Sequence, residues 1–255
     1  MWLQLKRTDT ITFLNNHTMG KKDLIRSIQK VVDILVEEKY VKDPSPVSKL
    51  SSTNDCKFDA LEFSIDKNIP THLNHNCNSL RLVLGGSITD NNKNLKNPYF
   101  DYNYQFNVSV LGDDNHNKTA INCFHIDYDD GSNSSVIHPL YHLTYGGMGL
   151  KDYELGNFLN MPVPRFPILP MDVILIIDLL LSNFLSHKDY KKITANSIYS
   201  NELRNSQTTY WKPYFQNIGM KWANVINSKG SNILAFDTRY NNPNFRKLVL
   251  PTLTD

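Results

Sequence analysis

The chain has 255 residues, a formal net charge of +2 and an apolar fraction of 40%. This composition is typical of a globular protein rather than a disordered one, and the small charge does not by itself indicate nucleic-acid binding. No apolar run reaches the roughly 18–20 residues that span a bilayer, so no membrane partner is expected. The three cysteines fit a reducing cytoplasm better than a disulfide framework, and we expect a cytoplasmic protein.

The first predicted element is an amphipathic helix over about residues 20–39. Its apolar residues recur at spacings of three and four, namely Leu24, Ile25, Ile28, Val31, Val32 and Leu35. Strand-like runs rich in aromatic and β-branched residues follow between about residues 56 and 148. Because the connections between them are short, we expect an antiparallel meander of about five strands.

A helical part is predicted over about residues 171–227. Asp172 can cap the helix "VILIIDLLLSNFL", which is apolar nearly all round and is therefore expected to be central. We expect a break in the later helices near Pro213 and a terminal hairpin over about 232–250. Residues 1–255 are thus predicted to form a single α+β domain, in which an antiparallel sheet packs against a central hydrophobic helix and further helices.

The candidate site lies in the stretch "FHIDYDDGSNSSVIHPLYHLTYGG", which holds three of the eight histidines. Since side chains alternate across a strand, His125 and Asp127 share a face of its first strand, and His138 and His142 share a face of its second. A register that pairs the apolar faces brings all four to the opposite side. Pro139 cannot donate to a ladder, so the second strand must be an edge or carry a bulge there.

Three interpretations of these four residues stay open. Three imidazoles and a carboxylate suit a divalent metal such as Zn, Mn or Fe, and water bound to such a metal becomes a nucleophile near neutral pH. Without a metal, the same residues could form an acid–base set in which Asp127 orients a histidine. The third interpretation is structural, with the histidines bonded to backbone carbonyls and tyrosine hydroxyls. The spacing matches no established metal motif.

Two further features bear on function. Asp178 lies inside the apolar helix, where a buried carboxylate needs a partner. Its carboxylate could accept a hydrogen bond from a hairpin histidine and hold that histidine in one tautomer. It could instead bond Arg165, a tyrosine or a backbone amide. The aromatic segment 208–215, "TTYWKPYF", is expected in the core or in a contact with a partner protein rather than in stacking on nucleic-acid bases.

The motifs "HIDYDDGSNSSVIHPLYHLTYGG", "PRFPILPMDVILIIDLLLSNF" and "YWKPYF" resemble a group of uncharacterised bacterial proteins from defence or toxin-type loci, over about residues 120–215. The resemblance implies a bacterial cytoplasm and a multi-gene system, and it brings no catalytic residues with it. Two functions are therefore weighed. The first is metal-assisted hydrolysis of nucleic acid or a nucleotide at the hairpin. The second is that of a non-enzymatic subunit in a bacterial multi-protein assembly.

Overall fold

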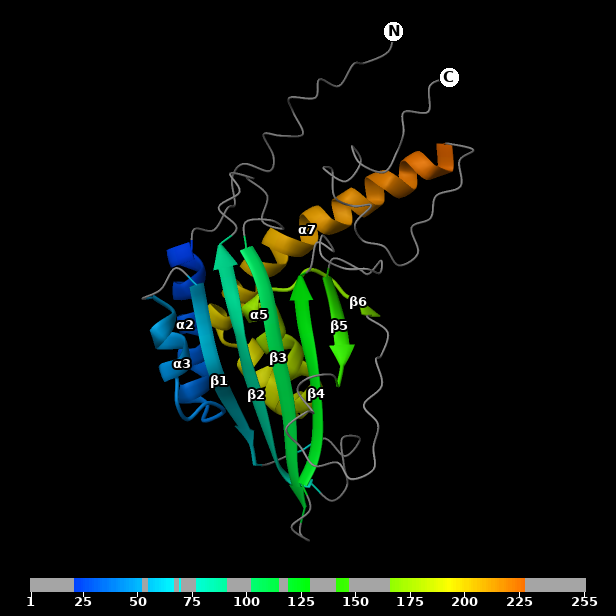
Figure 1. Ribbon diagram of the computed structural model, residues 1–255. Coiled ribbons are helices and arrows are strands. Elements are labelled where there is room, and N and C mark those ends of the chain that lie inside the picture. Colours follow the sequence, from blue (N-terminus) through cyan, green and yellow to red (C-terminus); the bar gives the residue numbers. More distant parts are fainter. Residues whose placement is uncertain are drawn as a thin grey trace.

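The computed structural model describes residues 21–51, 55–66, 69, 77–90, 102–114, 119–128, 141–146 and 166–227. Within these ranges the protein has an α+β fold. Six antiparallel strands form a meander in the order β1-β2-β3-β4-β5-β6, and five α-helices pack on this sheet (Figure 1). The predicted fold class is therefore confirmed.

The strands are β1 (Asp55–Ile65), β2 (Cys77–Asp90), β3 (Tyr102–Asp114), β4 (Thr119–Tyr128), β5 (Tyr141–Tyr145) and β6 (Phe166–Pro167). The α-helices are α2 (Lys21–Glu37), α3 (Ser45–Ser48), α5 (Val173–Phe184), α6 (His187–Thr194) and α7 (Ser197–Asn227), and η1 (Lys49–Ser51) is a short 3-10 helix. Helix α2 therefore lies where the apolar periodicity predicted a helix, and α5, α6 and α7 occupy the predicted helical part.

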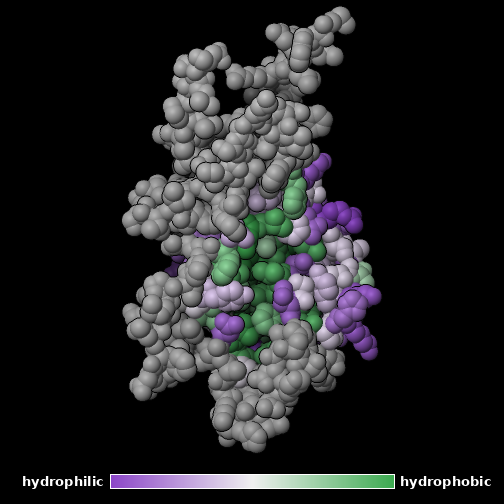
Figure 2. All heavy atoms as spheres, turned by 90° about the vertical axis from the view of Figure 1, so that its right-hand side faces the viewer, coloured by the Kyte–Doolittle hydropathy of each residue, from purple (hydrophilic) through white to green (hydrophobic). Residues whose placement is uncertain are grey.

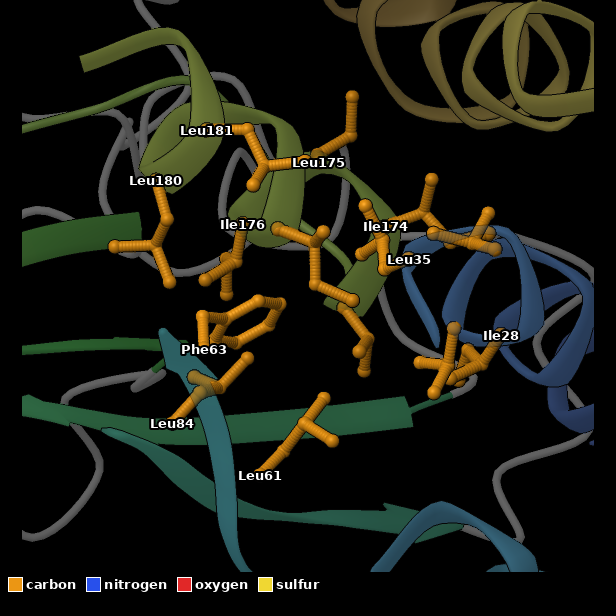
Figure 3. Close-up of a cluster of buried hydrophobic side chains, with 14 of the residues drawn as sticks. Ile28, Leu35, Leu61, Phe63, Leu84, Ile174, Leu175, Ile176, Leu180 and Leu181 are labelled. Carbon is orange, nitrogen blue, oxygen red and sulfur yellow. The ribbon is translucent and has the colours of Figure 1, made fainter. Parts of the chain in front are cut away.

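The apolar core lies between the sheet and the helices. Phe63 of β1 and Leu84 of β2 point toward Ile176 and Leu180 of α5, and Ile28 of α2 closes the cluster from one side (Figure 3). Seven of the twelve residues of α5 are buried, as its nearly continuous apolar sequence predicted. Burying each such side chain stabilises the fold by about 1.5–3 kcal/mol, so this layer holds the sheet and the helices together.

Asp172 caps α5 as the sequence predicted. One of its carboxylate oxygens accepts a hydrogen bond from the backbone N–H of Leu175 at 2.8 Å, and the other accepts one from Ser206 Oγ of α7 at 2.7 Å. The side chain is fully buried, and this burial raises the pKa of Asp172 to about 6 although both hydrogen bonds lower it. The cap therefore also joins α5 to α7.

Two elements differ from expectation. Helix α7 runs through Pro213 without a break: a proline removes one N–H from the helical ladder, and the helix continues on both sides of it. Strand β6 was not foreseen because it has two residues, paired with His142 and Leu143 of β5. Its Pro167 lies on the last strand of the sheet, where a proline is tolerated. The predicted hairpin over 232–250 lies outside the described residues.

The side of the molecule that carries β5 and β6 shows a band of apolar side chains flanked by hydrophilic ones (Figure 2). Phe124 and Ile126 of β4 belong to the hydrophobic core, and Leu143 of β5 packs against it. Among the described residues, no helix combines the length and the apolar character that crossing a bilayer requires.

Candidate metal centre

The register between β4 and β5 brings the candidate residues together. Asp127 lies opposite His142, and His125 lies opposite Thr144. Directly opposite side chains on antiparallel strands point to the same face of the sheet. Their neighbour Ile126 is buried in the helix-facing core, so these four residues lie on the face turned away from the helices. The alternation predicted from the sequence is confirmed for His125, Asp127 and His142.

The ligand atoms of these three residues converge. His142 Nε2 lies 2.7 Å from Asp127 Oδ1, and His125 Nε2 lies 4.0 Å from Asp127 Oδ2. One donor atom from each residue can be chosen so that all lie within 4.8 Å of one another. Two ligands on the same zinc ion, with bonds of about 2.0–2.2 Å, stand about 3–3.5 Å apart. The three residues therefore form a group that could hold a metal ion.

One side chain of the cluster is almost fully buried, and the other two are partly exposed. The His142 side chain is 1% exposed, that of Asp127 is 17% exposed and that of His125 is 29% exposed. On neighbouring β3, Gln105 lies opposite Asp127 and Asn107 lies opposite His125, and both of these β3 residues are exposed. The exposed side chains next to the cluster are therefore those of β3.

Asp127 carries the feature that most favours a cation. Its Oδ1 atom is buried and accepts no hydrogen bond from any described residue, although His142 Nε2 is only 2.7 Å away. The two atoms are close without the alignment that a hydrogen bond needs. A buried carboxylate oxygen without a hydrogen bond is unfavourable by about 1–3 kcal/mol or more, and native proteins nearly always give such a group a partner. A metal ion bound by both atoms would be such a partner.

The nearest thiol on this face is not part of the donor set. Cys123 is 2% exposed, its Sγ donates to the carbonyl oxygen of Gly146 at 3.5 Å, and burial raises the pKa of the thiol. Its sulfur is directed at a backbone carbonyl and does not belong to the group of donor atoms that converge. Gly146 has φ 70°, a left-handed conformation that glycine adopts without strain, and its N–H bonds Cys123 O where β5 ends. The donors are two imidazoles and one carboxylate.

The structure does not bring Asp178 to this cluster. Asp178 Oδ1 accepts hydrogen bonds from Tyr190 Oη at 3.0 Å and from Tyr199 Oη at 2.9 Å, which join α5 to α6 and α7. A tyrosine was one of the partners that the sequence allowed for Asp178. Asp178 lies in the helix layer, on the other side of the sheet from the cluster. Burial raises the pKa of the Asp178 carboxyl, and the two tyrosine donors lower it. The fourth predicted hairpin residue, His138, lies outside the described residues.

Sequence reasoning overlooked one residue of this face. Thr144 is 8% exposed, and its Oγ1 atom has no hydrogen-bond partner among the residues that the structure describes. The same alternation that selected His142 would have selected Thr144, which is two residues further along the strand. It was missed because a threonine in a strand is ordinarily read as a β-former.

Comparisons with known protein families, with curated proteins and with solved structures found no match to this chain. The resemblance of residues 120–215 to proteins of defence or toxin-type loci therefore stays a prediction. The functional argument depends on the geometry and the chemistry of the cluster itself.

Proposed function

We propose that the protein binds one divalent transition metal through His125, Asp127 and His142, and that this metal activates water for hydrolysis. The observation that carries the proposal is the convergence of two imidazoles on a carboxylate whose buried Oδ1 atom lacks a hydrogen bond from the described residues. Neutral imidazole and carboxylate donors without a thiolate suit Zn, Mn or Fe(II).

The chemistry follows from the number of ligands. Three protein donors leave a coordination position open, as in catalytic rather than structural zinc sites. Water bound to a catalytic zinc has a pKa near 7, so it supplies a hydroxide nucleophile at neutral pH. The partial exposure of His125 and Asp127 supports access of a substrate to that position. For the substrate we propose a phosphoester of a nucleotide or a nucleic acid, whose phosphoryl oxygen a divalent ion held by these three residues would polarise.

Metal binding is the first test. Chelator-treated protein is titrated with Zn, Mn or, without oxygen, Fe(II), and the bound metal is measured by elemental analysis. We expect one ion per chain, and a loss of affinity in Asp127→Asn and His142→Gln that exceeds the roughly 10- to 100-fold cost of changing a residue that only supports a ligand. The matched controls are Asp33→Asn and His187→Gln, which change exposed residues on α2 and α6. Substoichiometric metal in the unchanged protein, or equal losses in the controls, would refute the site.

Hydrolysis is tested separately. Metal-loaded protein is incubated with nucleotides and with short single- and double-stranded oligonucleotides, and the products are separated by chromatography. We expect turnover by the loaded protein and none by Asp127→Asn. A protein that binds metal with the expected affinity but cleaves none of these substrates would keep the site and exclude this substrate class.

A second candidate function is that of a non-enzymatic subunit in a multi-protein assembly. Exposed aromatic side chains favour this function. Tyr145 of β5 is 48% exposed and Phe166 of β6 is 49% exposed, and the register places both on the helix-facing side of adjacent strands. Within the segment 208–215, Tyr210 is 4% exposed whereas Phe215 is 54% exposed. Large exposed aromatics are enriched where proteins bind one another.

The subunit proposal is tested by purification from the native host. The unchanged protein and the double variant Tyr145→Ser/Phe166→Ser are isolated under the same conditions, and bound chains are identified by mass spectrometry. A defined partner that the double variant loses would support the proposal. A chain that runs alone and binds no product of the neighbouring genes would exclude it.

A further inference from the structure

Thr144 lies next to the proposed metal ligands. It is two residues after His142 on β5 and directly opposite His125 on β4, so its side chain lies on the same face as theirs. Within the described part of the chain, two buried side-chain atoms lack a hydrogen-bond partner, Asp127 Oδ1 and Thr144 Oγ1. Both belong to this one face of the β4–β5 pair.

An unbonded buried hydroxyl is unfavourable. A threonine hydroxyl carries one donor and two acceptor positions, and burying them without a partner loses the hydrogen bonds made with water in the unfolded chain. Each such group in a native structure therefore calls for an explanation, which can be a bound ligand, ion or water. Thr144 carries no charge and is a weak metal ligand beside imidazole and carboxylate donors, so a partner other than the metal itself suits it better.

The charge of the cluster indicates the chemistry of that partner. A divalent ion held by one carboxylate and two neutral imidazoles leaves the site with a net positive charge. On the adjoining part of β3, the side chains that face the cluster are the uncharged Gln105 and Asn107. Because a partly buried net charge is unfavourable, the remaining ligand on the metal is expected to be an anion. A hydroxyl donor on the same face as the three ligands favours an oxygen anion in particular.

We propose that the Thr144 hydroxyl donates a hydrogen bond to an oxyanion bound on the metal that His125, Asp127 and His142 hold. Thr144 thereby selects an anionic oxygen ligand, which is a phosphoryl or a carboxylate group of the substrate. This inference rests on the proposed metal site and adds to it the residue that binds the substrate's oxygen.

The test uses protein loaded with Co²⁺, whose visible absorption reports ligands on the metal. Acetate and inorganic phosphate are titrated at one pH into the unchanged protein, Thr144→Val and Thr144→Ser. Valine keeps the shape and removes the hydroxyl, whereas serine keeps the hydroxyl. We expect Thr144→Val to weaken anion binding by about five- to tenfold, and Thr144→Ser to stay within about twofold of the unchanged protein. The anion that binds more tightly distinguishes a phosphoryl from a carboxylate ligand.

A second measurement separates ligand binding from a structural role. If the hydroxyl has no partner in the metal-free protein, Thr144→Val will leave the Tm of that form unchanged or raise it, because an unsatisfied buried group is removed. A structural hydroxyl would instead lower the Tm. The inference is overturned if Thr144→Val binds both anions as tightly as the unchanged protein, or if neither anion changes the spectrum of the cobalt protein. A protein that takes up no Co²⁺, Zn, Mn or Fe(II) overturns the metal site itself.

Discussion

Both faces of the sheet bury polar side chains, but the two faces differ in whether the buried oxygens accept hydrogen bonds. On the helix side, Asp172 accepts hydrogen bonds from Leu175 N and Ser206 Oγ, and Asp178 accepts two from tyrosine hydroxyls. On the other side, Asp127 and Thr144 each bury an oxygen without a hydrogen bond from the described residues. Burial alone therefore does not separate the two faces, whereas the hydrogen bonds that the buried oxygens accept do.

The helix-side groups connect elements that are far apart in the sequence. Tyr104 of β3 and Tyr210 of α7 bring their hydroxyls to 2.5 Å, and Asp172 links the start of α5 to α7. Both contacts lie in the apolar layer, where a hydrogen bond is stronger than at the surface because the dielectric is low. The buried oxygens named here therefore find their partners within the protein, unlike Asp127 Oδ1 and Thr144 Oγ1 on the opposite face.

The largest expected effect comes from the apolar layer. Phe63 is fully buried, and Phe63→Ala should lower the free energy of unfolding by about 3–5 kcal/mol because it removes packed surface and leaves a cavity. Metal affinity of the folded protein should not change, since Phe63 faces the helices. Urea unfolding and a metal titration measure the two quantities. A loss of affinity as large as that of Asp127→Asn would show that the faces are coupled.

The free energy of unfolding should depend on pH because of Asp172. Its folded pKa of about 6 lies above the ordinary value of 3.8, so the folded state binds the proton more tightly than the unfolded state does. The contribution of this group to stability is therefore full below about pH 3.8 and is lost as the pH rises through about 6. The shift corresponds to roughly 3 kcal/mol between about pH 4 and pH 7.

Asp172→Asn isolates this contribution, because asparagine can still accept the bond from Leu175 N. Relative to the unchanged protein, the variant should gain stability as the pH rises from about 4 to about 7. Urea unfolding at several pH values measures the difference, with Asp33→Asn on the surface of α2 as the control. A difference that stays constant with pH would contradict the expected raised pKa.

Metal should stabilise the protein through Asp127, and a change at Asp172 on the helix side should not affect this stabilisation. At a free metal concentration of about 100 times Kd, binding to the folded state alone adds about 2.7 kcal/mol to the free energy of unfolding. Asp127→Asn should lose this stabilisation, and Asp172→Asn should keep it. Thermal unfolding with and without metal gives the comparison, and chelator should reverse the effect in the unchanged protein.

The smallest expected effect concerns Asp178. Asp178→Asn should lower the free energy of unfolding by about 1–2 kcal/mol, because the hydrogen bonds from Tyr190 and Tyr199 lose their charged acceptor. A double-mutant cycle with Tyr199→Phe should show that the two losses are not additive. Metal affinity and the NMR titration of His125 and His142 should stay unchanged. A shifted histidine would instead connect Asp178 to the site.

Local pattern was sufficient for most of the fold. The spacing of apolar residues in α2, the capping aspartate of α5 and the alternation along β4 each depend on a few neighbouring residues, so they could be predicted from the sequence. The two-residue strand β6 and the uninterrupted α7 could not be predicted in this way. An edge strand of two residues has no period to detect, and whether a helix continues through a proline depends on its tertiary context, which a local pattern does not specify.

For the site, the sequence by itself determined that His125 and Asp127 share one face of a strand, because side chains alternate with a period of two. Only the tertiary structure decided the rest. The register of β4 against β5 placed His142 opposite Asp127, and a shift by one residue would have turned one set of side chains to the other face. The packing of α6 and α7 gave Asp178 its two tyrosines and so separated it from the cluster. A carboxylate's partner is set by which elements meet in space, which a spacing in the sequence does not specify.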